Sequence, residues 1–386
     1  MPRPGHKSTV LVTGFPSFLA RKLTTHLVAN EPETRVLALV RGADLVEARR
    51  AIDALDEQER ARILLLEGDP SGIDLGLSGV ELRQIAGEVD RIHHCVHVSF
   101  LGTDKKSAEE ANVTSAGEIV EVAKLMTNLQ CFVLHSTAFV SGDRKGTVFE
   151  DDTSEGVGYR NVVEETRAHA ERIVRRASRS IPVAIVRPTL VVGDSGTGEI
   201  GRLNLPYLFT LLLLAAPEGM AIPLPAKGDV PLPFVPIDFV VRAACAIGAD
   251  PRSIGRTFHL VDPAPLSVKA YLELVHQIRE RRGSRMLFST FARSMLRTPG
   301  IEGYLRNPKA LVDQLLTNVR YDTRNADMVL RPADVVCPPL SSYAEKIVAA
   351  VEERLMGRPA AGSEKPEAPA ETADREAKSP EADAMD

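Results

Sequence analysis

Short apolar runs alternate with helix-like segments over the first half of the chain. Amphipathic stretches such as residues 109–127, where Ala111, Ile119, Val122 and Ala123 fall near helical spacing, separate the runs. Strands that alternate with helices in this way predict an α/β fold with a doubly wound parallel sheet. The six predicted strands span residues 9–13, 35–40, 62–68, 91–96, 131–137 and 183–189.

The pattern changes about halfway along the chain. Proline and glycine become frequent, and an apolar run at residues 205–216, LPYLFTLLLLAA, precedes a mixed helical end. We therefore expect one domain over residues 1–192, with its core at 8–192, and a smaller C-terminal lobe over residues 193–356 that is interleaved with the last strands of the sheet. Residues 357–386 are rich in Pro, Ala and Glu without periodicity, which predicts a disordered acidic tail.

Composition and charge narrow the class of protein. The chain has 386 residues, of which 44% are hydrophobic, enough for one large core or two domains. Its formal net charge of −5 comes mostly from the tail, so no nucleic-acid surface is indicated. The four cysteines are widely spaced, with no CxxC pair or metal-ligand cluster, which predicts reduced thiols, no metal site and a cytoplasmic protein. Met1 to Thr13 lack the apolar segment of a signal peptide.

The segment TGFPSFLA, after the first predicted strand, stands where a dinucleotide fold places its phosphate loop. Of the three glycines of such a loop only Gly14, at the tight turn, is present, and Ala20 stands at the third position, where alanine is tolerated. Ser17, at the second, adds a side chain where phosphate should lie close, although serine also caps helix N-termini, which favour anions. The segment is either a nucleotide loop or an ordinary strand-to-helix turn. As a nucleotide loop it would contribute Thr13, Gly14, Pro16, Ser17, Phe18 and Leu19 to cofactor binding.

Two charged residues follow the next predicted strands. Arg41 stands where an acidic residue would otherwise bind the ribose 2′-hydroxyl, and an arginine there accommodates a 2′-phosphate. No carboxylate stands beside it in VRGA, so NADP is favoured over NAD, the alternative being a solvated surface arginine. Asp69, in EGDP, lies near the expected adenine edge unless it is a plain turn residue.

Eight short segments form a collinear series: TGFPSFLA, GDPSGIDLGLS, HHCVHVSF, NVTSAGEIV, HSTAFVSG, RPTLVVGDSGTGEI, FVPIDFV and FHLVDP. In this order and spacing they resemble an extended short-chain dehydrogenase/reductase, of the branch with fatty acyl-CoA reductases and thioester-reductase domains. The resemblance covers residues 8–350 and implies a Rossmann-like NAD(P)-binding fold. It further implies that Asp69 contacts adenine, Asn112 holds a structural site in the middle helix, and the Thr137 hydroxyl polarises a substrate carbonyl. Further cofactor contacts would come from Cys95, Val96, His97, Arg167, Pro188 and Thr189.

The chain departs from this family at the catalytic pair. The family uses a tyrosine followed four residues later by a lysine, so that both project from one helical face toward cofactor and substrate. In NVVEETRAHAERIV, Asn161, Ala170 and Glu171 match the family pattern, whereas the tyrosine position holds Val163 and the lysine position holds Arg167. Valine has no proton to give, so the usual acid is missing.

Neighbouring residues do not restore the pair. Tyr159 lies four residues too early, and no lysine occurs between residues 148 and 227. Arg167 offers donors to ribose hydroxyls, but it is a permanent cation and a poor substitute for lysine in tuning a neighbour. Val96 and His97 replace the family's small alanines after the fourth strand, and His97 is either a replacement acid or an ordinary loop histidine.

These departures favour a reductase-like protein that is catalytically impaired and either keeps NAD(P) as a structural or sensory ligand or dispenses with it. One alternative is an active NADP-dependent oxidoreductase of acyl thioesters or lipid carbonyls that uses Thr137 with His97 or a bound water. Another is a lipid-binding or scaffolding protein without nucleotide.

The apolar run at residues 205–216 is too short to span a bilayer. It is an acyl-chain lid, a shallow membrane or partner contact, or a buried core helix. Leu211 to Leu214 cover every side of a helical turn and cannot all face one core, which supports the membrane or partner contact.

Overall fold

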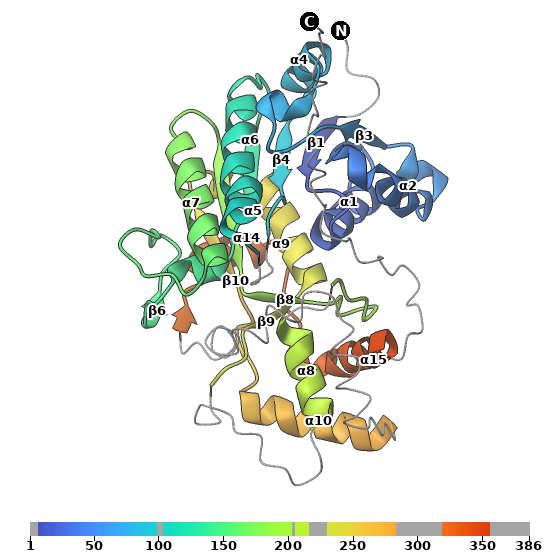
Figure 1. Ribbon diagram of the computed structural model, residues 1–386, viewed down its shortest axis with the longest axis vertical. Helices are drawn as coiled ribbons and strands as arrows, with labels where there is room; N and C mark the ends of the chain where they lie inside the picture. Colours follow the sequence, from blue (N-terminus) through green and yellow to red (C-terminus); the bar gives the residue numbers. More distant parts are fainter. Residues whose placement is uncertain (1–6, 99–102, 203–204, 216–229, 283–318, 356–386) are drawn as a thin grey trace, which may run out of the picture.

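The computed structural model describes residues 7–98, 103–202, 205–215, 230–282 and 319–355. Its centre is a seven-stranded sheet of parallel neighbours in the order β10-β7-β5-β4-β1-β2-β3 (Figure 1). The predicted α/β fold is confirmed, with β10 as a strand beyond the six predicted. The strands are β1 (Ser8–Thr13), β2 (Thr34–Val40), β3 (Ile63–Glu67), β4 (Arg91–His94), β5 (Cys131–His135), β7 (Val183–Pro188) and β10 (Thr257–Leu260).

The strand order reverses between β1 and β4. Connections leave the sheet on opposite faces at this topological switch point, and doubly wound folds bind ligands there, outside the carboxyl ends of the strands. The residues that follow β1, β4 and β5 therefore lie where folds of this class bind ligands.

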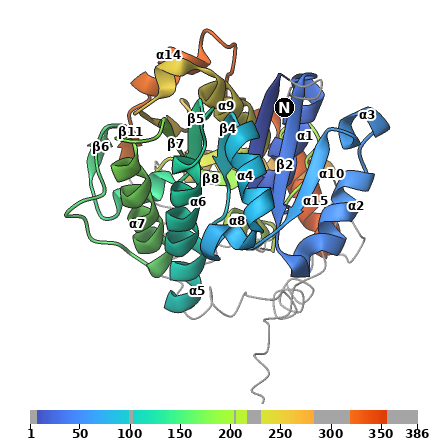
Figure 2. The same cartoon turned by 90° about the horizontal axis from the view of Figure 1, so that it is seen from above.

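Helices cover both faces of the sheet (Figure 2). The first face carries α4 (Gly79–Glu88), α6 (Ser115–Lys124) and α7 (Val162–Ala177). The opposite face carries α1 (Phe18–Asn30), α2 (Leu45–Asp53), α9 (Ile237–Ala249) and α14 (Arg324–Leu330). Shorter elements are α3 (Glu57–Arg60), α5 (Lys105–Glu109), the π-helical turn η3 (Glu110–Thr114), and the 3-10 helices η1 (Gly42–Asp44), η2 (Ile73–Gly76), η4 (Ala138–Ser141), η5 (Pro251–Ser253) and η6 (Leu340–Ser342).

The strands are continuous apolar runs because both of their faces are buried. Side chains alternate between the faces with a period of two. On β1, Leu11 packs with the α4, α6 and α7 side, whereas Val10 and Val12 pack with the α1 side. On β5, Phe132 and Val133 divide in the same way.

A smaller lobe lies beyond the carboxyl ends of the sheet strands. It contains α8 (Leu205–Ala215), α10 (Val268–Arg282) and α15 (Ala344–Leu355), with its own apolar core (Figure 1). The pair β8 (Leu190–Val192) and β9 (Phe234–Pro236) joins this core, and β6 (Gly146–Val148) pairs with β11 (Val319–Tyr321). After β9 the chain returns to the sheet through α9 and β10, so the residue numbers of the domain boundaries stay predictions. The predicted tail lies outside the described residues.

The leucine run belongs to the core of the lobe. Leu211, Leu213 and Leu214 are each at most 2% exposed, because α8 packs against both α10 and α15. These three leucines therefore face the core, as the core-helix alternative expects. The side chain of Leu212 lies outside the described residues, so whether all four face one core is not tested. Among the described helices, none is long and apolar enough to cross a bilayer.

Candidate cofactor and active site

The loop between β1 and α1 contains one position that requires glycine. Gly14 has φ of 81°, and a Cβ on it would come within 3.0 Å of the Cys95 carbonyl carbon and the Val96 nitrogen. A side chain there would be strained in conformation and blocked by the end of β4. The turn after β1 therefore lies directly against the end of β4, at the switch point.

Ser17 occupies its position without needing a glycine conformation. Its φ of −50° and ψ of 155° are accessible to any L-residue, and its side chain is the N-cap of α1, accepting from the Ala20 nitrogen at 3.5 Å. Ser17 is exposed, so the N-terminus of α1 opens to solvent. A helix N-terminus of this kind favours an anionic group.

A pocket of about 550 Å³ opens at the carboxyl ends of β2 and β3. This is the end of the crevice where the sequence places the adenosine half of a dinucleotide. Asp69 faces it from a tight turn in which its carboxylate accepts from the Ser71 nitrogen at 2.9 Å. The pocket is lined by Arg41, Gly42, Glu67, Gly68, Asp69 and Gly76.

Carboxylates accompany Arg41 in this pocket. Arg41 Nε donates to Asp44 Oδ2 at 2.8 Å, so the expectation that no acid competes beside Arg41 is wrong. Asp44 lies three residues after Arg41, so the two side chains stand on the same turn of the chain. Glu67 also lies close, since its Oε1 is 2.9 Å from where a Cβ on Gly42 would be. The arginine side chain is still 59% exposed and accessible to a ligand.

Cys95, Val96 and His97 follow β4, as the sequence predicts for the edge of the cofactor site. His97 Nδ1 lies 2.9 Å from the Cys95 carbonyl oxygen. Because a carbonyl only accepts, Nδ1 carries the proton and Nε2 of the neutral ring is an acceptor. Burial, and then the Arg167 cation, hold the pKa of His97 well below its ordinary value. At neutral pH His97 therefore has no proton to give at Nε2, which argues against its role as a replacement acid.

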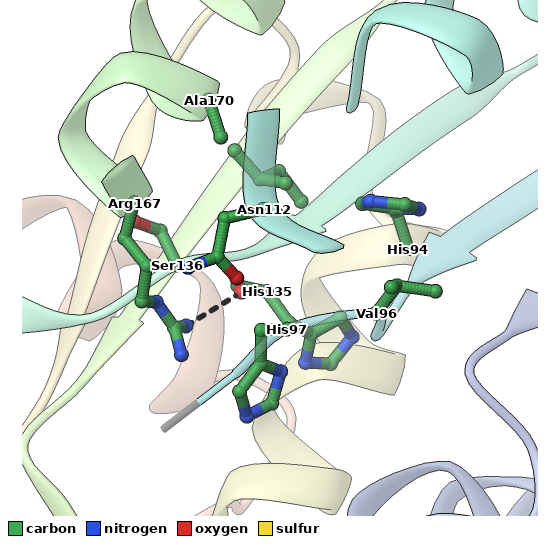
Figure 3. A pocket seen from close by; sticks show the side chains of 9 residues that line it. His94, Val96, His97, Asn112, His135, Ser136, Arg167 and Ala170 are labelled. Carbon is green, nitrogen blue, oxygen red and sulfur yellow. Dashed lines mark hydrogen bonds between the residues drawn. The ribbon is translucent and has the colours of Figure 1, made fainter. Parts of the chain in front are cut away.

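Helix α7 brings Val163 and Arg167 onto one buried face. Asn161 caps the helix by accepting from the Glu164 nitrogen at 2.9 Å, which fixes where the first turn begins. Val163 and Arg167 are 6% and 8% exposed, one turn apart. Arg167 Nη2 donates to the His135 carbonyl oxygen at 2.9 Å, so the guanidinium points inward onto the end of β5 (Figure 3).

Arg167 stays cationic although it is buried. Burial lowers the pKa of its guanidinium to about 10, still well above neutral pH. The charge suppresses protonation of the imidazoles around it, and burial is the larger cause of the low pKa of His94 and His135, each about 3. Where β4 and β5 end, the Arg167 guanidinium is therefore a fixed positive charge beside the neutral rings of His94, His97 and His135.

Asn112 ties the β4 loop to α7. It lies in the π-helical turn η3, within the helix predicted at residues 109–127. Its Oδ1 accepts from the Val98 nitrogen at 2.9 Å and its Nδ2 donates to Thr166 Oγ1 at 2.8 Å. π-Helical turns of this kind occur often at functional sites. Here the turn fixes the loop that carries His97 relative to Arg167.

A small cavity remains between these groups. Its volume is about 10 Å³, room for about one water molecule. His135 Nδ1 is buried at its wall without a hydrogen-bond partner among the described residues. The cavity is lined by His94, Val96, His97, Asn112, Leu134, His135, Ser136, Arg167 and Ala170 (Figure 3).

Thr137 and the segment after β7 lie together at the substrate side. Thr137 follows β5 and caps η4, with its Oγ1 accepting from the Phe139 nitrogen and donating to the Pro188 carbonyl oxygen, both at 3.4 Å. Thr189 Oγ1 is buried with no hydrogen-bond partner in the described part of the chain. The structure therefore brings together three residues that the sequence placed beside nicotinamide and substrate.

Tyr159 does not take the place of the missing tyrosine. Its hydroxyl donates to the Ser154 carbonyl oxygen at 2.6 Å and accepts from Arg172 Nη1 at 3.2 Å. Both partners hold the phenol away from the Arg167 face of α7.

A buried ionic network behind the site was not predicted. Glu171 is fully buried and pairs with Arg187 at 2.5 Å and Arg175 at 2.9 Å, while Ser136 Oγ donates to it at 2.8 Å. Although burial opposes it, these cations and the hydroxyl lower the pKa of Glu171 to about 2. The network fixes α7, and with it Val163 and Arg167, against β5 and β7.

Comparison with known proteins identifies relatives over more than half of this chain. A family model described as male sterility protein, an NAD-binding family, matches residues 12–244. The chain is 26% identical to a linear gramicidin synthase polypeptide of Brevibacillus parabrevis, over 87% of this chain and 7% of that protein. It is 24% identical to fatty acyl-CoA reductase 1 of Gallus gallus, over 61% of this chain and 53% of that protein. It thus spans about half, or much less, of the length of these relatives.

A solved structure agrees with this assignment. The terminal R domain from the myxalamid PKS-NRPS biosynthetic pathway superimposes with a TM-score of 0.74 at 25% identity, covering 94% of each chain. The reductase (R) domain of a nonribosomal peptide synthetase from Mycobacterium tuberculosis shares the fold, with a TM-score of 0.66 at 21% identity over 92% of this chain and 94% of that one. The chain belongs to the male sterility protein family, in the fatty acyl-CoA reductase-like branch of the extended short-chain dehydrogenase/reductases.

Proposed function

We propose that this protein binds a nicotinamide dinucleotide but is impaired in carbonyl reduction. The observation that carries the proposal is the pair Val163 and Arg167 on the buried face of α7, where the family has tyrosine and lysine. When bound, the reduced cofactor supplies a hydride, and the chain must supply a proton to the carbonyl oxygen. Val163 has none, and His97 presents an acceptor at Nε2.

The residues present fit the phosphates and the adenosine half of the cofactor. Gly14 and the open N-terminus of α1 suit a pyrophosphate, and Asp69 faces the pocket beyond it. We expect NADP(H) ahead of NAD(H), because the exposed Arg41 guanidinium suits a 2′-phosphate. Asp44 and Glu67 weaken that preference by pairing with or lying near the arginine.

The second candidate is an active NADP-dependent reductase of acyl thioesters, acyl-CoA or other lipid carbonyls. It is favoured by the names of the relatives, which include a fatty acyl-CoA reductase, and by the place of Thr137 at the end of β5, next to Pro188. Its proton would come from a bound water. An acyl chain is the substrate class it implies, and a cytoplasmic location is supported by four free, buried cysteines.

The experiment that tests the proposal restores the catalytic pair. Purified protein is assayed for NADPH oxidation with long-chain acyl-CoA and long-chain aldehyde, beside the double variant Val163→Tyr with Arg167→Lys. We expect the variant to be faster, by up to the factor of about 10²–10⁴ that a positioned acid contributes. Ordinary turnover by the unmodified protein would favour the second candidate instead.

A further inference from the structure

A junction segment, residues 193–201, follows β8 and lies against helix α1. A Cβ on Gly201 would come within 3.0 Å of a ring carbon of Phe18, so the segment is in close contact with the first residue of α1. The N-terminus of this helix is where the pyrophosphate of a dinucleotide is proposed to bind. The junction segment therefore lies beside the phosphate end of the cofactor site.

Two cations of α1 form ion pairs with carboxylates of the junction segment. Arg21 Nη1 lies 2.8 Å from Glu199 Oε1, and Lys22 Nζ lies 2.9 Å from Asp194 Oδ2. Lys22 Nζ also lies 2.7 Å from Glu199 Oε2. The four side chains are only 13–29% exposed, so solvent screens these pairs less than it screens a fully exposed pair.

The same two cations lie over the ring of Phe18. Arg21 Cζ is 5.5 Å and Lys22 Nζ is 5.8 Å from the ring centroid, within the range of a cation–π contact. Although burial opposes it, Glu199 and Asp194 raise the pKa of Lys22, so this ammonium keeps its charge at neutral pH. Phe18, which follows the phosphate loop directly, is thus held by groups that are themselves bound to the junction segment.

The junction segment is also bonded to the smaller lobe. Lys346 of α15 donates from Nζ to the carbonyl oxygens of Ser195 at 3.1 Å and Gly196 at 2.7 Å. A Cβ on Gly198 would come within 3.0 Å of Lys346 Cβ, so the segment is in close contact with this helix as well. Helices α1 and α15 lie on the same side of the molecule (Figure 1). The segment therefore contacts both the helix of the phosphate loop and a helix of the lobe.

These contacts make the order of α1 and of α15 depend on each other. A pyrophosphate bound at α1 restricts the turn that carries Phe18, and the ion pairs extend this restriction to the junction segment. Because coupling between two sites is reciprocal, a ligand that orders α1 also stabilises α15, and a displaced α15 weakens the binding of that ligand.

We propose that Arg21 and Lys22 are positioning residues, which hold the first turn of α1 for the dinucleotide and couple its binding to the smaller lobe through Asp194 and Glu199. This inference rests on the nucleotide binding proposed above. It makes the dinucleotide a ligand that stabilises the lobe, a role that needs no hydride transfer.

Two measurements on the full chain test this inference: calorimetric titration with NADPH, and amide hydrogen exchange with and without saturating NADPH. We expect NADPH to slow exchange in α15 as well as in the first turn of α1. Lys22→Met should abolish the slowing in α15 and keep it in α1, and Lys22→Arg, which keeps the cation, should restore it. Lys124→Met is the matched control, because Lys124 forms an exposed ion pair with Glu121 on α6 and should change neither measurement.

The sign of the change in Kd distinguishes positioning from a simple effect of charge. Positioning predicts that Lys22→Met and Glu199→Gln each weaken NADPH binding by about two- to fivefold, because each breaks the same contact. Side chains that act only as charges near the phosphate predict weaker binding when the cation is lost and tighter binding when the carboxylate is lost. Opposite changes in the Kd of the two variants therefore overturn the inference.

The remaining outcomes separate this inference from the proposed function. NADPH binding without slower exchange in α15, or equal slowing in Lys22→Met, overturns the inference and leaves nucleotide binding standing. Failure of NADPH to bind the unmodified chain overturns both. A Lys22→Met variant that does not fold is replaced by Lys22→Gln, for which the same loss of slowing in α15 is expected.

Discussion

Replacing Glu171 with glutamine should destabilise the protein strongly. The carboxylate is fully buried between Arg187 and Arg175 and accepts from Ser136 Oγ. Glutamine keeps the size of the side chain but removes its charge, and Arg187, itself only 2% exposed, then has no carboxylate partner among the residues that the structure describes. Breaking a buried pair by removing one partner costs about 3–5 kcal/mol, because an uncompensated charge stays buried.

The pKa of Glu171 gives the same magnitude. The pKa is about 2 in the folded chain and 4.5 in its ordinary state, and that difference corresponds to about 3 kcal/mol at neutral pH. Because the folded pKa is lowered, this stability is present above pH 4.5 and is lost as the pH falls from there toward 2. The Glu171→Gln variant should therefore lose stability at pH 7 and show a flatter pH dependence below pH 4.5.

Urea unfolding followed by circular dichroism measures both effects. The control is Glu165→Gln, on the same helix but exposed, which should change the free energy of unfolding by no more than about 0.5 kcal/mol. A loss of less than about 1 kcal/mol in Glu171→Gln at pH 7 would mean that the network does not hold α7 in place. The positions of Val163 and Arg167 would then need another explanation.

Other predictions concern the pocket, the histidines and the smaller lobe. Arg41→Ala should weaken the binding of NADPH more than that of NADH, because it removes a cation near the 2′-phosphate. Glu67→Gln should strengthen the binding of NADPH, because it removes an anion from the same place. Titration of each variant with both cofactors checks this. Stability should fall as the pH drops below 6.5, because burial lowers the pKa of His94 and His135 to about 3, so each ring is neutral in the folded chain and takes up a proton on unfolding. Each histidine then lowers the free energy of unfolding by about 1.4 kcal/mol per pH unit. A urea midpoint that does not change between pH 7 and 5.5 would contradict this. Leu213→Ala should cost about 2–5 kcal/mol, as a core position does, and a folded protein of unchanged stability would favour a surface role for α8.

Sequence alone could place the sheet because its strands are buried on both faces. The run at residues 35–40 can be recognised as a strand without knowing its neighbours in the sheet. Its alternate side chains enter two different cores, so every position of a buried strand is apolar. The replacement of tyrosine and lysine by Val163 and Arg167 was also accessible, because the pair is defined by spacing on one helix. Features that depend on spacing alone can therefore be predicted from the sequence.

Side-chain direction was not accessible in the same way. The spacing places Arg167 on the correct face of α7 but does not say that its guanidinium turns inward to the His135 carbonyl, a choice that depends on three-dimensional neighbours. The pairing of Arg41 with Asp44 and the approach of Glu67 to Gly42 likewise depend on how the loops after β2 and β3 fold. The sequence left the role of α8 open between a core helix and a lid or surface contact, and only its packing against α10 and α15 decides for Leu211, Leu213 and Leu214.

The most direct test of the central claim is a single-turnover measurement with the unmodified protein. Protein in excess over NADPH is mixed with long-chain acyl-CoA or aldehyde, and the loss of reduced nicotinamide absorbance is followed after binding has been established by titration. An impaired site predicts bound NADPH that is oxidised at least about 10²-fold more slowly than the ordinary enzyme rate. Oxidation of the bound cofactor at about 1–10³ s⁻¹ would contradict the account, because it would require a proton donor that Val163 and His97 do not provide.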